Sequence, residues 1–265
     1  MSETDRVLEL AIRLAREAGA IQRKHYETAI KIRTKSASID LVTEVDHACE
    51  ALIVERLTDE RPDDAILAEE GGGSDREDAA WRWVVDPLDG TTNYAHGYPR
   101  FCVSIGVEKH GAREVGVVYD PLLDELYEAA RGKGARLNGR VLQVSRENDL
   151  GAALIATGFA YDVRRSAEDN LEHFAQVIKR ARAVRRDGSA ALDLCYVAAG
   201  RFDGFWELKL HPWDVAAGLL IVDESGGRTS DIHGGPPPRS GRAIVASNGR
   251  IHDALIFLLE GGAPR

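Results

Sequence analysis

The feature that most constrains this chain is a pair of short apolar runs that each end directly in carboxylates. The run at residues 65–68 is followed by Glu69 and Glu70, and the run at residues 83–85 is followed by Asp86. Apolar runs of this length predict buried strands. Acidic side chains at the edge of a core are costly unless they are paired or bind a cation. The sequence therefore predicts buried strands whose carboxyl ends deliver acids.

The segment 86–93, Asp-Pro-Leu-Asp-Gly-Thr-Thr-Asn, is the most informative stretch. Pro87 lacks a backbone donor and has a fixed φ, so we expect it to end the ladder of its strand. Gly90 permits a tight turn, and Thr91 and Thr92 begin a helix whose N–H groups point back toward the acids. Two carboxylates, a carbonyl and a hydroxyl on one turn are hard oxygen ligands of the kind that Mg²⁺ prefers. Taken alone, the motif also fits an ordinary capped helix start with solvent-facing acids.

The rest of the sequence predicts helices and strands, which follow one another in a different order in the two halves of the chain. The expected helices span residues 5–27, 44–57, 167–182, 189–199 and 213–224, and a last helix ends near residue 259. The expected strands span residues 101–107, 114–119, 125–130, 154–157, 205–208 and 244–246, and residues 35–38 read as a loop. The middle of the chain is thus a meander, whereas the second half alternates strands with helices. Mixed sheets sandwiched by helices follow from this order.

Length and composition are those of a globular protein. The 265 residues suffice for one large α/β domain or two intimately packed ones. No apolar stretch approaches the length of a membrane span, and the acidic N-terminus lacks the features of a signal peptide, so we expect a cytoplasmic location. The net charge of −9 argues against non-specific nucleic-acid binding by the whole surface. Cys49, Cys102 and Cys195 lie far apart in apolar contexts, which predicts buried free thiols.

Five motifs that follow one another in the chain resemble those of the inositol monophosphatases. They are Lys35 with residues 40–46, residues 68–70, residues 83–93, residues 188–191, and Glu207 with residues 212–218. Their order and spacing agree with the family from about residue 5 to residue 250. The resemblance implies a layered αβαβα fold of the α/β (α+β) class, as a single domain over residues 1–265 with subdomains at about 1–148 and 149–265. It also implies Mg²⁺ dependence, inhibition by Li⁺ and a homodimer.

The resemblance also implies roles for the acids. It puts one Mg²⁺ on Glu69, Asp86, the carbonyl of Leu88 and Thr91, a second on Asp86, Asp89 and Asp214, and a weaker third on Glu69 and waters. An Asp86 that bridges two ions at roughly 3.5–4 Å would give the two-metal geometry for in-line displacement. Glu69 and Thr91 would orient or deprotonate the attacking water, with Asp46 supporting the Thr91 hydroxyl.

Further residues of the motifs are expected to bind substrate. The resemblance puts the phosphate on Gly90, Thr91 and Thr92, and the polyol on Asp89, Gly188, Ser189, Ala190 and Glu207. Lys35 would belong to an active-site loop. Each role has a plainer alternative, because Lys35 fits a solvated lysine, Glu207 a surface acid and Ser189 a simple helix cap. We interpret His211 as structural and Trp213 as a core residue that fixes the direction of Asp214.

Several substrates remain open at this stage. The leading hypothesis is hydrolysis of myo-inositol 1-phosphate or a related small polyol or sugar phosphate. Phosphatases that act on 3′-phosphoadenosine 5′-phosphate usually carry Lys where Thr92 stands, which argues against that substrate. Histidinol-phosphate and fructose-1,6-bisphosphate phosphatases are alternatives, although the surroundings of Glu207 favour inositol monophosphatase. Some bacterial members of the family also associate with the transcription machinery and antitermination factors of ribosomal RNA, and the arginines at 180, 182, 185 and 186 are a candidate surface for such a partner.

Overall fold

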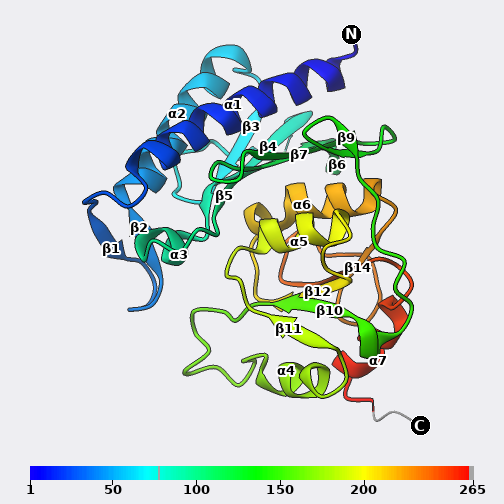
Figure 1. Ribbon diagram of the computed structural model, residues 1–265. Helices are drawn as coiled ribbons and strands as arrows, with labels where there is room; N and C mark the ends of the chain where they lie inside the picture. The colour runs from blue at the N-terminus through cyan, green and yellow to red at the C-terminus, as the bar shows by residue number, and fades with distance from the viewer. Residues whose placement is uncertain (77, 263–265) are drawn as a thin grey trace.

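A computed structural model describes residues 1–76 and 78–262 of the chain. The elements stack in five layers, which Figure 1 shows from top to bottom. Helices α1 (Glu3–His25) and α2 (Glu44–Glu60) cover a seven-stranded sheet, and α5 (Ala190–Ala198) and α6 (Pro212–Glu224) separate it from a five-stranded sheet. Helices α4 (Leu171–Ile178) and α7 (His252–Leu259) cover the far side. The αβαβα layer order that the family resemblance implies is confirmed.

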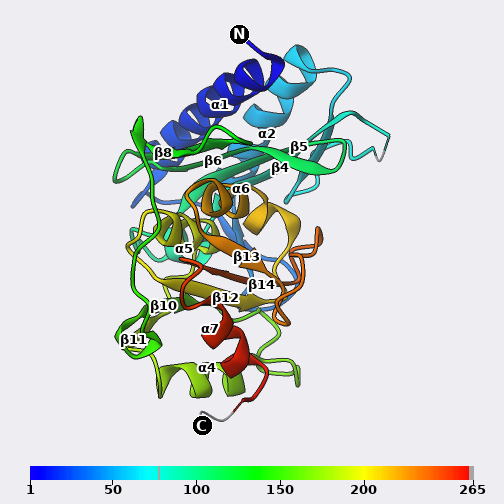
Figure 2. The ribbon, with the colours of Figure 1, turned by 90° about the vertical axis from the view of Figure 1, so that its right-hand side faces the viewer.

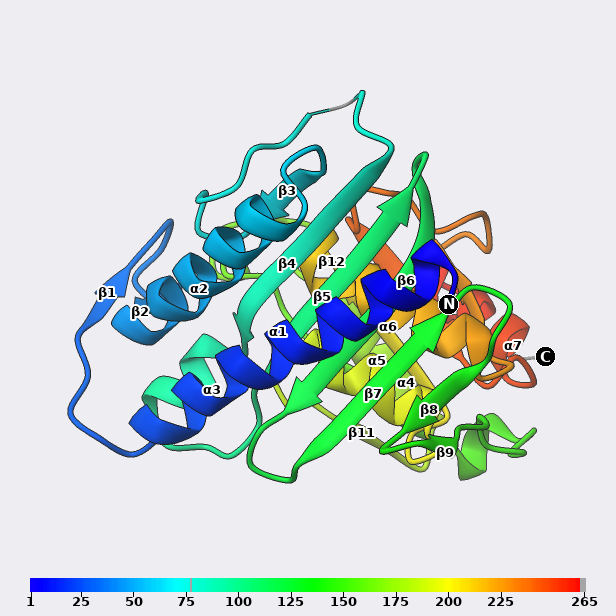
Figure 3. The same ribbon diagram turned by 90° about the horizontal axis from the view of Figure 1, so that it is seen from above.

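The seven-stranded sheet carries the acid motif. Its strands lie in the order β3 (Ala65–Ala68), β4 (Trp81–Asp89), β5 (Cys102–Lys109), β6 (Ala112–Asp120), β7 (Glu125–Ala130), β8 (Ala135–Leu137) and β9 (Arg140–Val141). The predicted meander is confirmed, because β4 to β9 pair antiparallel in sequence order. β3 and β4 are parallel, so Glu69 and Asp86 emerge at the same edge of the sheet. Figure 3 shows α1 and α2 lying across the outer face.

β4 continues past Pro87, contrary to the expectation that this proline ends the ladder. Asp86 pairs with Ser104, and after a register shift the pairing resumes at Asp89 opposite Cys102. A bulge tolerates proline because its extra residue makes no ladder hydrogen bond. The bulge keeps both Asp86 and Asp89 within the buried end of the strand. The next residue, Gly90, then leads into the short helix α3 (Thr91–Ala95).

Helix α6 packs unusually close to the seven-stranded sheet. A Cβ added at Gly106 of β5 would lie 2.6 Å from the Cβ of Ala216, and one at Gly116 of β6 would lie 2.6 Å from the carbonyl oxygen of Ala217. Only glycine allows this approach of helix to strand. Because Asp214 lies in the first turn of α6, the contact fixes that carboxylate relative to β4.

The five-stranded sheet lies on the other side of α5 and α6, as Figure 2 shows. Its order is β11 (Ala183–Arg185), β10 (Leu154–Thr157), β12 (Gly204–Leu208), β14 (Ala243–Ser247) and β13 (Arg228–Ser230), and the 3₁₀ turn η1 (Leu150–Ala152) precedes β10. β10 is parallel to both neighbours, and β14 is antiparallel to both of its own. Glu207 lies near the end of β12, which directs it toward the same end of the molecule as Gly158 after β10.

Some predicted elements need correction. The helix expected over 167–182 is wrong at both ends: α4 begins only after Asn170, whose φ of 68° is left-handed, and it already ends at Ile178. The sequence pattern also misses β1 (Ile32–Thr34), β2 (Leu41–Thr43), β8, β9, β11 and β13, because strands of two or three residues show too little alternation. β1 and β2 form a hairpin whose connection includes the predicted loop 35–38.

The apolar side chains form three clusters between the layers, under α1 and α2, around α5 and α6, and under α4 and α7. Cys49, Cys102 and Cys195 are buried free thiols, as expected. No helix within the described ranges is long and apolar enough to cross a membrane.

Candidate active site

The predicted site residues converge on one cavity of about 1090 Å³. All of them except Asp46 line it: Lys35, Glu69, Asp86, Leu88, Asp89, Gly90, Thr91, Thr92, Gly188, Ser189, Ala190, Glu207 and Asp214. They come from both sheets and from both middle helices, so the fold assembles the site from segments far apart in the sequence. Asp46 lies directly behind Thr91.

Four carboxylates gather on the floor of this cavity. Burial raises the pKa of Asp86 well above its usual range, and the charges of Glu69, Asp89 and Asp214 raise it further. Burial and the charge of Asp89 do the same to Asp214, and burial raises the pKa of Glu69 to about 7. These carboxyl groups thus lie within repulsive reach of one another, in surroundings that solvate charge poorly. Such a cluster calls for a cation.

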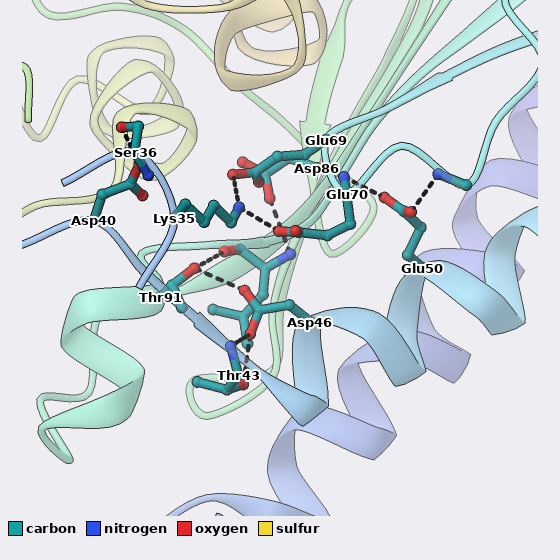
Figure 4. Close-up of polar contacts among 12 residues, drawn as sticks. Lys35, Ser36, Asp40, Thr43, Asp46, Glu50, Glu69, Glu70, Asp86 and Thr91 are labelled. Atoms are coloured by element: carbon teal, nitrogen blue, oxygen red, sulfur yellow. Dashed lines mark hydrogen bonds and ion pairs between the residues drawn. The ribbon is translucent and has the colours of Figure 1, made fainter. Parts of the chain in front are cut away.

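The ammonium group of Lys35 balances part of this negative charge. Lys35 Nζ lies 2.7 Å from Glu69 Oε1 and also pairs with Glu70, as Figure 4 shows. The loop that carries Lys35 is closed by Asp40, whose carboxylate accepts hydrogen bonds from the N–H and hydroxyl of Ser36 at 3.0 and 2.6 Å. The hairpin β1–β2 therefore holds the lysine over the acid cluster.

The donor set fits Mg²⁺. Besides the four carboxylates it offers the carbonyl oxygen of Leu88 and the hydroxyl of Thr91, all hard oxygen donors. Across residues 1–76 and 78–262, no three Asp, Glu, His or Cys side chains stand close enough to enclose a metal ion without rearrangement. The Lys35 side chain, which is bonded to Glu69, would have to move away for a metal ion to reach that carboxylate.

Thr91 is oriented by a buried acid. Its hydroxyl donates to Asp46 Oδ1 at 2.8 Å and lies 3.1 Å from the carbonyl oxygen of Leu88. Asp46 is fully buried, and its other oxygen accepts the Thr43 backbone N–H at 2.9 Å, so the carboxylate caps α2 as well. Burial raises the pKa of Asp46, while the threonine donors oppose that rise. Figure 4 shows this series of hydrogen bonds from Thr43 through Asp46 to Thr91.

Glu50 is a site residue that sequence reasoning missed. Its carboxylate accepts the backbone N–H of Glu70 at 2.7 Å and that of Gly72 at 2.8 Å (Figure 4). A Cβ at Gly72 would lie 2.7 Å from Glu50 Oε1, so the turn closes tightly on this side chain. Glu50 therefore sets the turn that presents Glu69. The sequence gives no signal for this role, because the partners of Glu50 are backbone N–H groups.

The turn at Gly90 has little freedom. Its φ of 98° is left-handed, and a Cβ would lie 2.7 Å from the carbonyl oxygen of Arg100. Both facts require glycine. The buried hydroxyl of Thr92, two residues on, has no hydrogen-bond partner in the structure, although it belongs to a residue that lines the cavity. An unpaired buried hydroxyl is costly, and a ligand oxygen would satisfy it.

The start of α5 is joined to β4 through Asp89. Its Oδ2 accepts the Ser189 hydroxyl at 2.7 Å and the Ala191 N–H at 2.8 Å. Asn93 Nδ2 donates to the carbonyl oxygen of Asp187 at 2.8 Å, which anchors the loop before α5 to the acid motif. Ser189 is therefore more than a simple cap, since one hydroxyl serves both α5 and Asp89.

Glu207 is enclosed at the opposite wall. Burial raises its pKa to about 8, the positive charge of Arg186 works against the rise, and Asp89 adds to it. A Cβ at Gly158 would lie 2.2 Å from the Glu207 carboxylate, so the chain after β10 packs directly on this acid. Its burial and its place in the cavity do not fit a solvated surface acid.

One interpretation from the sequence needs correction here. Trp213 is only half-buried and lines the cavity instead of filling the core. His211 also lines the cavity and stacks on Trp213, with ring centroids 4.8 Å apart and planes 12° from parallel. Sequence reasoning also left out Tyr161, Lys209 and other residues of the outer wall, because they lie in loops without a recognisable motif.

The comparisons with known proteins agree with this geometry. The model of the Inositol monophosphatase family matches residues 3–261. The chain belongs to the inositol monophosphatase family. Nus factor SuhB of Escherichia coli K12 is 44% identical to this family member over 251 residues, which cover 94% of each protein. The inositol-1-monophosphatase of Synechocystis is 45% identical over 248 residues, covering 94% of this chain and 86% of the relative.

The fold is shared over the same length. The structure of an inositol monophosphatase from Anabaena superposes with a TM-score of 0.90 and 41% identity, covering 99% of this chain and 98% of the other. Members of the family are generally metal-dependent, and membership supports a phosphatase that acts on a small-molecule phosphate.

Proposed function

We propose that the chain is a Mg²⁺-dependent phosphomonoesterase that hydrolyses myo-inositol 1-phosphate or a related small polyol or sugar phosphate. The observation that carries this proposal is the buried cluster of Asp86, Asp89 and Asp214 with Glu69, close to the unpaired hydroxyl of Thr92. Clustered carboxylates suit cations, and the hydroxyl suits a phosphate oxygen. The Synechocystis relative bears the name inositol-1-monophosphatase, which supports the choice of substrate.

The residues that would hold Mg²⁺ are Glu69, Asp86, Asp89, Asp214, Thr91 and the carbonyl of Leu88. When bound, the metal supplies positive charge that stabilises developing charge on the phosphoryl and leaving oxygens. Because the Thr91 proton is donated to Asp46, the lone pairs of the hydroxyl are free to orient the attacking water. Glu69, at the end of β3 beside Asp86, would help to orient or deprotonate that water.

The alcohol portion of the substrate would lie toward Glu207 and the loop after β10. Asp89 and Glu207 offer carboxyl groups to its hydroxyls, and Ser189 at the start of α5 is bonded to Asp89. The phosphate would lie at Gly90 and Thr92, beside the acids. In this arrangement the alcohol of the substrate faces hydroxyl-binding groups, which favours polyols.

A substrate panel with titrated Mg²⁺ tests the proposal. It contains inositol 1-phosphate, histidinol phosphate, fructose 1,6-bisphosphate and 3′-phosphoadenosine 5′-phosphate, with release of phosphate measured for each. We expect the highest kcat/KM for inositol 1-phosphate and little turnover of the nucleotide, since Thr92 carries no charge for it. No turnover of inositol 1-phosphate beside fast turnover of histidinol phosphate would overturn the choice of substrate.

A second candidate function, binding to a transcription complex, is favoured by the relatives named Nus factor SuhB. Arg182 and Arg185 are exposed and offer a basic surface for such a partner. Arg186 lines the cavity beside Glu207, so its charge is not separable from catalysis. A pull-down with Arg182→Glu and Arg185→Glu tests this role. Unchanged capture of transcription proteins would reject this surface, and loss of capture with full phosphatase activity would support it.

The same proposal includes a homodimer, sensitivity to Li⁺ and a cytoplasmic location, as the family resemblance implies. Analytical ultracentrifugation checks the first, and we expect twice the mass of one chain. Inhibition of phosphate release by LiCl at fixed ionic strength, with NaCl as the control, checks the second.

A further inference from the structure

The outer wall of the cavity is a loop whose two ends are tied together. It runs from Gly158 after β10 to Asn170 before α4 and is visible at the left of Figure 1. Asn170 Nδ2 donates to the carbonyl oxygen of Gly158 at 2.7 Å and to the Thr157 hydroxyl at 3.1 Å, while its Oδ1 accepts from Trp206 Nε1 at 2.7 Å. A surface loop with joined ends is an Ω-loop, a compact unit that is frequently functional.

The middle of this loop is fastened by Lys209. The Lys209 ammonium donates to Asp162 Oδ2 at 2.8 Å and to the Ser166 hydroxyl at 2.5 Å. The Lys209 side chain is only 17% exposed, whereas that of Asp162 is 51% exposed, so the ion pair is buried at its lysine end only. Arg242 adds an exposed pair to Glu168 at 3.0 Å farther along the loop.

Lys209 adopts a backbone conformation that costs energy. Its φ is 59°, in the left-handed region that favours glycine and disfavours a long side chain. Such a cost is maintained where the surrounding structure, often a functional site, requires it. Here the conformation follows β12 directly and sends the side chain to the loop. The strand that presents Glu207 is thereby tied to the wall that packs on Glu207 at Gly158.

We propose that Lys209 is a positioning residue that latches the 158–170 loop over the alcohol side of the cavity, and so sets how tightly the alcohol portion of the substrate is held. The inference rests on the proposed phosphatase function for its kinetic part only. Loop residues from Phe159 to Val163 line the cavity, so a released loop removes one wall of the site but leaves the acid cluster intact. The latch therefore acts on KM and leaves kcat nearly unchanged.

Lys209→Asn separates this role from a merely structural one. Asparagine tolerates the left-handed conformation but is too short to reach Asp162. We expect a KM about tenfold higher, equal to about 1.4 kcal/mol, with kcat within about twofold. Amide hydrogen exchange within 159–168 should become faster, whereas Tm should stay the same or rise. Lys209→Arg should restore most of the wild-type KM, because it restores the ion pair.

His110→Asn is the matched control, since His110 also has a left-handed φ, of 49°, in an exposed hairpin turn away from the cavity. It should change neither KM nor exchange in the loop.

Unchanged exchange in 159–168 in Lys209→Asn would overturn the latch, and so would a higher KM without faster exchange, which would mean direct contact with substrate. Faster exchange with unchanged KM would show that Lys209 holds the loop but that the loop does not affect substrate binding. This result would also overturn the proposal. If the wild type hydrolyses no phosphomonoester, the proposed function fails, and the exchange measurement alone decides whether Lys209 holds the loop.

Discussion

Asp86→Asn should make the metal-free protein more stable and the enzyme almost inactive. Asp86 is 2% exposed and faces three other carboxylates, so its pKa lies well above the ordinary range. Each unit of such a rise represents about 1.4 kcal/mol against the charged form. An amide of the same shape removes the charge and can still accept the Leu88 N–H, now 2.9 Å from Asp86 Oδ1. We expect a gain of about 2 kcal/mol, or roughly 6 °C in Tm for a chain of this length.

The loss of activity has the same origin. The charge that destabilises the metal-free fold is the charge that would attract both ions, so removing it should lower kcat at least about 100-fold. Differential scanning calorimetry in EDTA and in saturating Mg²⁺ measures the first effect, and phosphate release measures the second. Mg²⁺ should raise the Tm of the wild type more than that of the variant, since ligand stabilisation follows affinity for the folded state.

Asp193→Asn is the control for a buried carboxyl group outside the cavity. Asp193 is 1% exposed, its pKa is also raised well above the ordinary range by burial, and it lies outside the cavity lining. This variant should gain stability with activity and Mg²⁺ dependence intact. An Asp86→Asn enzyme with near-normal kcat and unchanged Mg²⁺ dependence, or with a lower Tm in EDTA, would refute the reasoning.

Three further changes probe other parts of the site. Thr91→Val removes the hydroxyl that donates to Asp46, so denaturant unfolding should show a loss of about 1–2 kcal/mol and kcat should fall at least about 100-fold; full activity would contradict the role. Glu207 has a pKa of about 8 in the fold against an ordinary 4.5, so the folded state keeps a proton that the unfolded chain releases. Its contribution to the free energy of unfolding therefore falls as pH rises from about 4.5 to 8. Glu207→Gln should flatten that part of the curve of unfolding free energy against pH. An unchanged slope would show that Glu207 is not protonated there. Glu50→Leu leaves the turn after Glu69 without its acceptor, and the Mg²⁺ concentration for half-maximal activity should rise about tenfold; an unchanged value would show that the turn holds without Glu50.

The layered fold could be predicted because its parts leave strong local patterns. The apolar run before Asp86 and the amphipathic face of α1 each encode one element, and the order of the elements encodes the layers. Pro87 was misread because its effect on a strand depends on the pairing partner: a bulge opposite β5 absorbs the missing donor. The helix over 167–182 was overextended because the left-handed turn at Asn170 is set by its bonds to Gly158 and Trp206, which no local pattern contains.

The site residues likewise fall into those that the sequence predicts and those that it does not. Glu69, Asp86, Asp89 and Thr91 lie in motifs with fixed spacing, and the structure brings them to one cavity. Glu50 could not be predicted, because its partners are backbone N–H groups and no sequence motif specifies them. The outer wall is likewise held by pairs between distant segments, whose partners are identified only once the chain has folded.

The central claim is that the acid cluster around Asp86 hydrolyses a small polyol phosphate only when Mg²⁺ is present. The most direct test is phosphate release from myo-inositol 1-phosphate while Mg²⁺ is titrated into protein freed of metal with EDTA. We predict no release without Mg²⁺ and a saturable rise as it is added, with Asp86→Asn inactive throughout. Release that persists undiminished in EDTA, or no release at any Mg²⁺ concentration, would contradict the account.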